Sequence, residues 1–92
     1  MAKKKKFDWT KHELPGAIQM VNSSNLRAVH FDPDTLILQV YFHARKGKPE
    51  GIYRYTPVPQ IAYKELLKAE SVGQYFVNNI LKIGGLETHK VQ

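Results

Sequence analysis

Basic and aromatic side chains are the residues of this 92-residue chain whose types and spacing could do chemistry. Cations bind phosphate groups and flat side chains stack on bases, so the two together indicate nucleic-acid binding. The candidate phosphate ligands are Lys3, Lys4, Lys5, Lys6, Arg45, Lys46, Lys48 and Arg54. The candidate stacking residues are Tyr41 and His43, which alternate along one strand-like segment. We therefore expect RNA, single-stranded nucleic acid or another polyanion as the partner, contacted through a basic hairpin loop and a lysine tail.

Two other kinds of partner fit the same residues. If Ile37, Tyr41 and His43 lie on an uncovered sheet face, they form an apolar patch with a polar rim, which is typical of a protein interface. The basic loop could also hold a small anionic ligand such as a nucleotide. A purely structural interpretation stands beside these: the lysine run keeps the chain soluble, and the tyrosines pack under an N-terminal tail that contains Phe7 and Trp9.

Catalytic and metal-binding patterns are weak. The chain has no cysteine, which excludes a thiol nucleophile and thiolate zinc ligands. His30 and His43 are expected about 20 Å apart on the strands, too far to share one metal ion. Asp32 and Asp34 fall in a turn, where aspartate bonds its own backbone. We expect no enzymatic activity, no cofactor and no metal.

Charge and composition bound the class of protein. The net charge is +6, and the lysine run contributes four of the fourteen basic residues, so the rest of the chain is only mildly basic. The composition, 42% hydrophobic and 24% charged, is typical of one globular domain. No apolar run approaches the roughly 18 residues that span a bilayer, and no apolar segment follows the lysine run as in a secretion signal. We expect a cytoplasmic protein.

The hydrophobic pattern predicts strands over residues 26–31, 36–43 and 52–55, then helices over 59–69 and from Ser71, whose side chain caps the second helix. One face of the central strand is uniformly apolar and the other mixed; they carry Leu36, Leu38, Val40 and Phe42, and Ile37, Gln39, Tyr41 and His43. The predicted fold is α+β: a three-stranded antiparallel meander followed by two α-helices packed on one sheet face. We expect a tail over residues 1–16, the domain over 17–85, and a frayed C-terminus over 86–92.

An ordered set of short motifs runs through the folded part of the chain. The set is Val21-Asn22-Ser23-Ser24, Leu26, Phe31-Asp32, Leu38-x-Val40-x-Phe42, Tyr53-x-Tyr55, Val58-Pro59, Tyr63, Leu66-Leu67, Ala69 and Ser71-x-Gly73-x-Tyr75-Phe76-x-Asn78. Over residues 21–81 this order resembles the KTSC domain, a module named from its occurrence at the C-terminus of some lysyl-tRNA synthetases.

The resemblance implies a compact domain with strands before helices, often the whole of a small bacterial or phage protein. It implies no enzymatic activity, and it suggests an association with RNA. Two features depart from the family pattern: the loop over residues 44–51 is longer and more basic than a short glycine turn, and the lysine run lies outside the shared region.

Overall fold

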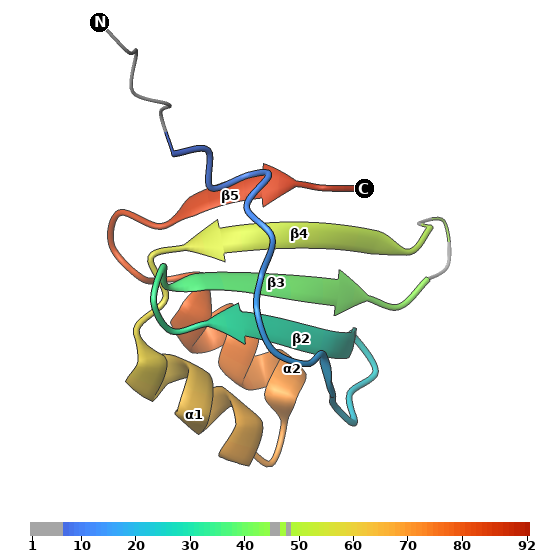
Figure 1. The fold of residues 1–92 in the computed structure, drawn as a ribbon. Helices are drawn as coiled ribbons and strands as arrows, with labels where there is room; N and C mark the ends of the chain where they lie inside the picture. Colours follow the sequence, from blue (N-terminus) through green and yellow to red (C-terminus); the bar gives the residue numbers. More distant parts are fainter. Residues whose placement is uncertain (1–6, 45–46, 48) are drawn as a thin grey trace, which may run out of the picture.

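The computed structural model describes residues 7–44, 47 and 49–92 as a five-stranded antiparallel sheet with both helices on one face (Figure 1). Neighbours in the sheet follow the order of the chain, β1-β2-β3-β4-β5. The elements are β1 (Gln19–Met20), β2 (Leu26–Asp32), β3 (Ile37–Phe42), β4 (Gly51–Thr56), α1 (Gln60–Lys68), α2 (Val72–Tyr75), the π-helical turn η1 (Phe76–Ile80) and β5 (Glu87–Lys90). The α+β class is confirmed, and the prediction of three strands is wrong.

The two additional strands lie at the edges of the sheet. β1 has two residues and pairs with β2, while β5 pairs with β4 so that Lys90 lies opposite Tyr53 and His89 opposite Arg54. The C-terminal residues expected to fray therefore include a strand. β5 consists of Glu, Thr, His and Lys, so it carries no alternation of apolar and polar residues from which a strand could be predicted.

The turn between β2 and β3 covers residues 33–36, one position later than the gap over 32–35 between the predicted strands. Asp32 pairs with Ile37, and Leu36 lies in the loop with a φ of 60°, in the left-handed region. The Asp32 carboxylate accepts hydrogen bonds from the Asp34 N–H and the Thr35 hydroxyl, which shapes this turn. Leu36 and His43 therefore lie outside β3, contrary to the predicted strand over 36–43, but the faces assigned to residues 37–42 are unchanged.

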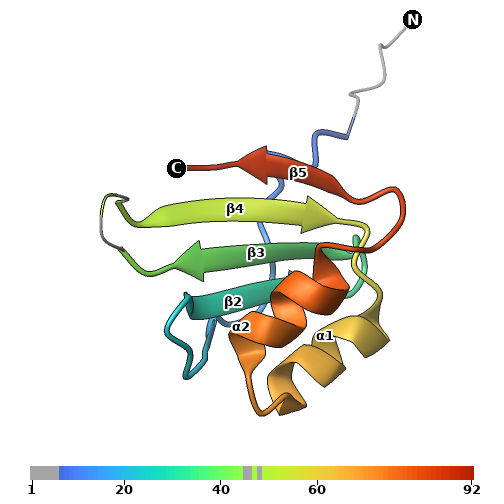
Figure 2. The same cartoon turned by 180° about the vertical axis from the view of Figure 1, so that it is seen from behind.

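The hydrophobic core lies between the sheet and the helices (Figure 2). It consists of Leu26, Val29, Leu38, Val40, Tyr55, Val58, Leu66, Val72, Phe76 and Ile80. The Ser71 Oγ accepts a hydrogen bond from the Gln74 N–H at 3.2 Å, so the predicted cap of the second helix is confirmed. Burying each large apolar side chain contributes about 1.5–3 kcal/mol, which makes this interface the main source of stability.

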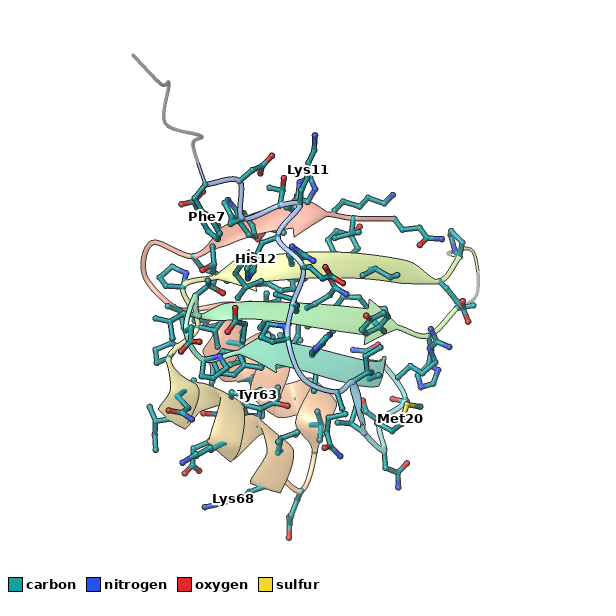
Figure 3. The ribbon with its side chains drawn as sticks, in the orientation of Figure 1. Phe7, Lys11, His12, Met20, Tyr63 and Lys68 are labelled. Atoms are coloured by element: carbon teal, nitrogen blue, oxygen red, sulfur yellow. The ribbon has the colours of Figure 1, made fainter. Side chains whose placement is uncertain are left out.

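Residues 7–16, here called the N-terminal strap, cross the opposite face of the sheet (Figures 1 and 3). The strap runs across the strands from β5 towards β2. It is folded at Asp8, whose carboxylate accepts hydrogen bonds from the N–H and hydroxyl of Thr10. The helices lie behind the sheet in this view, so the sheet is covered on both faces. Within the described part of the chain, no helix is long and apolar enough to cross a membrane.

Candidate functional site

A buried hydrogen-bond network occupies the sheet face beneath the strap. Arg54 is 8% exposed; its Nε donates to Gln39 Oε1 at 2.6 Å and its Nη1 to the Trp9 carbonyl at 2.8 Å. The Gln39 amide donates to the Tyr41 hydroxyl at 2.6 Å. Burial lowers the pKa of the Arg54 guanidinium below its ordinary value. Arg54 and Tyr41, both predicted to contact nucleic acid, thus take part in internal contacts on this face.

Further contacts hold the rest of the strap. Asp32 accepts a hydrogen bond from His12 Nε2 at 3.1 Å, and His30 Nε2 donates to the Pro15 carbonyl at 2.9 Å. The Trp9 ring meets the His89 ring edge-on at 6.0 Å, and Leu14 is buried. Ile37 beneath is fully buried, so the apolar patch expected in the absence of a covering tail does not form on this face.

The other predicted phosphate ligands fall outside the described residues. These are Lys3, Lys4, Lys5, Lys6, Arg45, Lys46 and Lys48. Their role stays a prediction from the sequence. The last three stand in the chain between His43 and Pro49, and both of those residues line a cleft at the end of the β3–β4 hairpin.

This aromatic cleft has a volume of about 420 Å³. It is lined by Phe42, His43, Pro49, Glu50, Gly51, Tyr53, Tyr55 and Lys90. Of the two residues predicted to stack on bases, His43 lines this cleft and Tyr41 does not. The His43 N–H donates to the Asn25 carbonyl at 3.0 Å, which connects His43 to the loop before β2. Lys90 places a cation beside Tyr53, its cross-strand neighbour.

Ring contacts fix the shape of the aromatic cleft. Phe42 meets Tyr53 edge-on at 5.7 Å, and Tyr53 stacks near-parallel to Tyr55 at 6.5 Å. Behind them, Phe76 contacts Phe42 at 5.8 Å and Tyr55 at 5.3 Å, so the helices support the ring cluster from the core side. Burial raises the pKa of the Tyr55 hydroxyl to about 12. Tyr53 and Phe42 are only partly buried, which leaves ring surface for a ligand.

Gly51 lets the Tyr53 ring lie against the β4 backbone. A Cβ at position 51 would lie 3.3 Å from Tyr53 Cε1, closer than ordinary van der Waals contact. Sequence reasoning missed this cleft because alternation showed that Tyr53 and Tyr55 share a face but not which face. The register with β3 decides it, since Tyr53 lies opposite Val40 and Tyr55 opposite Leu38 on the helix side.

A second hollow, the polar cleft, has a volume of about 680 Å³ and lies between the loop before β2 and the start of the second helix. It is lined by Asn22, Ser23, Ser24, Asn25, Glu70, Ser71, Val72, Gly73, Gln74, Val77 and Asn78. Ser23 shapes the loop before β2 and Ser71 caps the second helix, but residue patterns along the chain do not indicate that the two segments meet.

Two comparisons identify the family. The sequence pattern of the KTSC domain matches residues 22–82. The chain belongs to the KTSC domain family. An uncharacterized protein of Stutzerimonas stutzeri (strain A1501) is 37% identical over 62 residues, which cover 67% of this chain and 79% of the relative. The crystal structure of a KTSC domain protein from Yersinia pestis superposes with a TM-score of 0.66 at 29% identity, over 83% of this chain and 97% of that chain.

The residues matched by the KTSC pattern include almost all of both clefts but neither the strap nor β5. The match contains every residue of the polar cleft and all residues of the aromatic cleft except Lys90. The N-terminal strap and β5 lie outside it. Among the described residues, no three His, Asp or Glu side chains are grouped so that they could hold a metal ion.

Proposed function

We propose that this KTSC domain binds single-stranded nucleic acid at the aromatic cleft. In this proposal a base stacks on the exposed ring surface of Tyr53 and Phe42, and cations around the cleft contact the backbone phosphates. A cleft of about 420 Å³ falls within the range of small-ligand pockets. Stacking on an aromatic ring is available to every base, so this mode needs no particular sequence.

The observation that carries the proposal is that the ring cluster meets one cation of the described residues, Lys90, at one end of the sheet. Lys90 lies opposite Tyr53, and the chain segment that contains Arg45, Lys46 and Lys48 begins and ends at residues of the cleft. Relative to the sequence prediction, the stacking surface moves from Tyr41 on the strap face to Tyr53 and Phe42 on the helix face.

One residue of the cleft opposes phosphate. Glu50 lines the rim and is exposed, so its carboxylate repels a nucleic-acid backbone. The Glu50→Gln variant keeps the shape of the side chain and removes the charge. It should bind more tightly than the wild type, and the difference should shrink as salt is raised.

Fluorescence anisotropy with a labelled oligouridine of about 12 nucleotides tests the proposal. Tyr53→Ala should weaken binding by roughly 5- to 150-fold, the loss expected for one stacked base, whereas Tyr53→Phe keeps the ring and should bind like the wild type. Circular dichroism checks that each variant is folded. Equal affinities for Tyr53→Ala and the wild type would contradict stacking at this cleft.

Salt dependence tests the cations. Lys90→Ala should reduce the slope of log affinity against log salt by about one, and the triple change of Arg45, Lys46 and Lys48 to Ala by more. Lys68→Ala is the matched control, because Lys68 is exposed at the end of α1, away from the aromatic cleft (Figure 3). A wild-type protein that binds no oligonucleotide at about 50 mM salt would overturn the proposal in favour of a protein partner.

A further inference from the structure

The polar cleft is assembled by three local features from segments about fifty residues apart in the chain. Ser23 Oγ accepts hydrogen bonds from the N–H groups of Asn25 and Leu26, which folds the loop before β2. Ser71 caps the facing helix. Gly73 lets the two approach, because a Cβ there would lie 3.2 Å from Ser23 Oγ. A side chain at position 73 would therefore push the loop before β2 away from the second helix and change the shape of the polar cleft.

The polar side chains that line the polar cleft are amides and hydroxyls, apart from the carboxylate of Glu70. Asn22, Gln74 and Asn78 are exposed, and their side-chain amides make no hydrogen bond within the described part of the chain. Glu70 is the charged residue among those lining the cleft, and none of them is Lys or Arg. Each amide offers both a donor and an acceptor. This chemistry suits hydroxyl groups and base edges, and it disfavours phosphate.

The two clefts adjoin. Asn25 of the polar cleft accepts the N–H of His43, which lines the aromatic cleft, at 3.0 Å. Phe76 supports the aromatic cleft from η1, and the next two residues, Val77 and Asn78, line the polar cleft. Figure 2 shows the end of β3, the start of β4, the loop before β2 and the start of α2 at one end of the sheet. A single strand could thus lie across both.

We propose that the polar cleft holds the nucleotide next to the stacked one through its ribose 2′-hydroxyl, so that the domain binds RNA in preference to DNA. The inference rests on the proposed function, because the aromatic cleft must first hold the strand. A hydroxyl that both donates and accepts matches the amides of Asn22, Gln74 and Asn78. The phosphates of this nucleotide remain outside the polar cleft, where no Lys or Arg lines the surface.

The test compares oligouridine with oligodeoxyuridine of the same length, which differ only in the 2′-hydroxyl. We expect the wild type to bind the ribose form about 5- to 10-fold more tightly, as one or two added hydrogen bonds would give. Asn78→Ala should bring the affinity for the ribose form down to that of the deoxyribose form and leave the latter unchanged. Asn79→Ala is the matched control: Asn79 is the next residue in η1, does not line the cleft, and bonds the Tyr75 carbonyl.

The outcomes separate the inference from the proposed function. Equal binding of the two oligonucleotides by the wild type, or an equal loss for both in Asn78→Ala, would overturn the inference and leave stacking at the aromatic cleft intact. Binding of neither oligonucleotide would overturn both. Asn22→Ala, on the facing loop, should repeat the effect of Asn78→Ala; a ribose preference that survives both substitutions would also overturn the inference. Both positions are exposed, so thermal unfolding should match the wild type.

Discussion

The helices cover one face of the sheet with apolar side chains, whereas the N-terminal strap covers the other mainly with hydrogen bonds. On the helix face, Leu38, Val40 and Phe76 exclude water from one continuous core. On the strap face, Arg54 and His30 reach backbone carbonyls of the strap, and Asp32 accepts from a strap histidine. Apolar burial contributes stability wherever the shapes fit, while a buried polar contact depends on one particular partner. The two faces should therefore respond differently to substitution.

Removing a core ring should have the largest effect. Phe76→Ala takes away a side chain that is 2% exposed and supports both Phe42 and Tyr55. We expect a loss of about 3–5 kcal/mol in the free energy of unfolding, measured by urea denaturation. The neighbouring Val77 is 44% exposed, and Val77→Ala should change stability by only about 0.5 kcal/mol. Similar losses in both variants would show that the helices contribute less than the apolar core implies.

Breaking the strap face should cost less. Arg54→Leu removes the donor to Gln39 and to the Trp9 carbonyl, and we expect a loss of about 1–3 kcal/mol in the same measurement. Arg27→Leu is the control, because Arg27 is exposed on β2 and should tolerate the change. Proteolysis of residues 7–16 should also speed up in Arg54→Leu alone. Unchanged stability and proteolysis would mean that Arg54 does not hold the strap.

The smallest predicted effect is a pH dependence that belongs to the strap face. Hydrogen bonding from the Thr35 hydroxyl, above all, holds the pKa of Asp32 below its usual value, with the Asp34 N–H and His12 contributing. A lowered folded-state pKa stabilises the fold fully above the unfolded value of about 3.9, and this stabilisation is lost as pH falls through the folded pKa. Asp32→Asn should therefore be less stable than the wild type at pH 7 and lose less stability on acidification.

Urea midpoints measured at about pH 7 and pH 3 give this comparison. Asp34→Asn serves as the control, since Asp34 is exposed in the same turn and should follow the wild type at both pH values. If Asp32→Asn loses as much stability on acidification as the wild type does, the carboxylate of Asp32 is not the group responsible.

What the sequence could predict follows the same division between faces. The helix face follows from apolar periodicity, so its strands, its helices and the Ser71 cap could be read from residue types. The strap face depends on contacts across long sequence distances, such as that of Arg54 with the backbone carbonyl of Trp9. Every residue has a backbone carbonyl, so residue types do not indicate which carbonyl is contacted. Because the sequence does not show this contact, it predicts Arg54 as a phosphate ligand. It predicts a frayed end at β5 because that strand has no alternation of apolar and polar residues.

The candidate site could be predicted from the sequence only in part. The basic loop and the importance of aromatic residues could be inferred from the sequence, and His43 does line the aromatic cleft. The register of β4 against β3, which turns Tyr53 towards the helix side, and the meeting of the loop before β2 with the second helix could not. Both depend on how segments pair in space, which single-residue patterns do not encode.

The contact between Trp9 and His89 has a consequence for the order in which the chain can fold. The strap leaves the ribosome before any strand of the sheet, yet its Trp9 ring packs on His89 of the last strand, eighty positions later. Until β5 has emerged and paired with β4, Trp9 lacks its ring neighbour. The core between the helices and β2–β4 can form from residues that emerge earlier. Docking of the strap should therefore be a late step of folding during synthesis, one that follows assembly of the helix face.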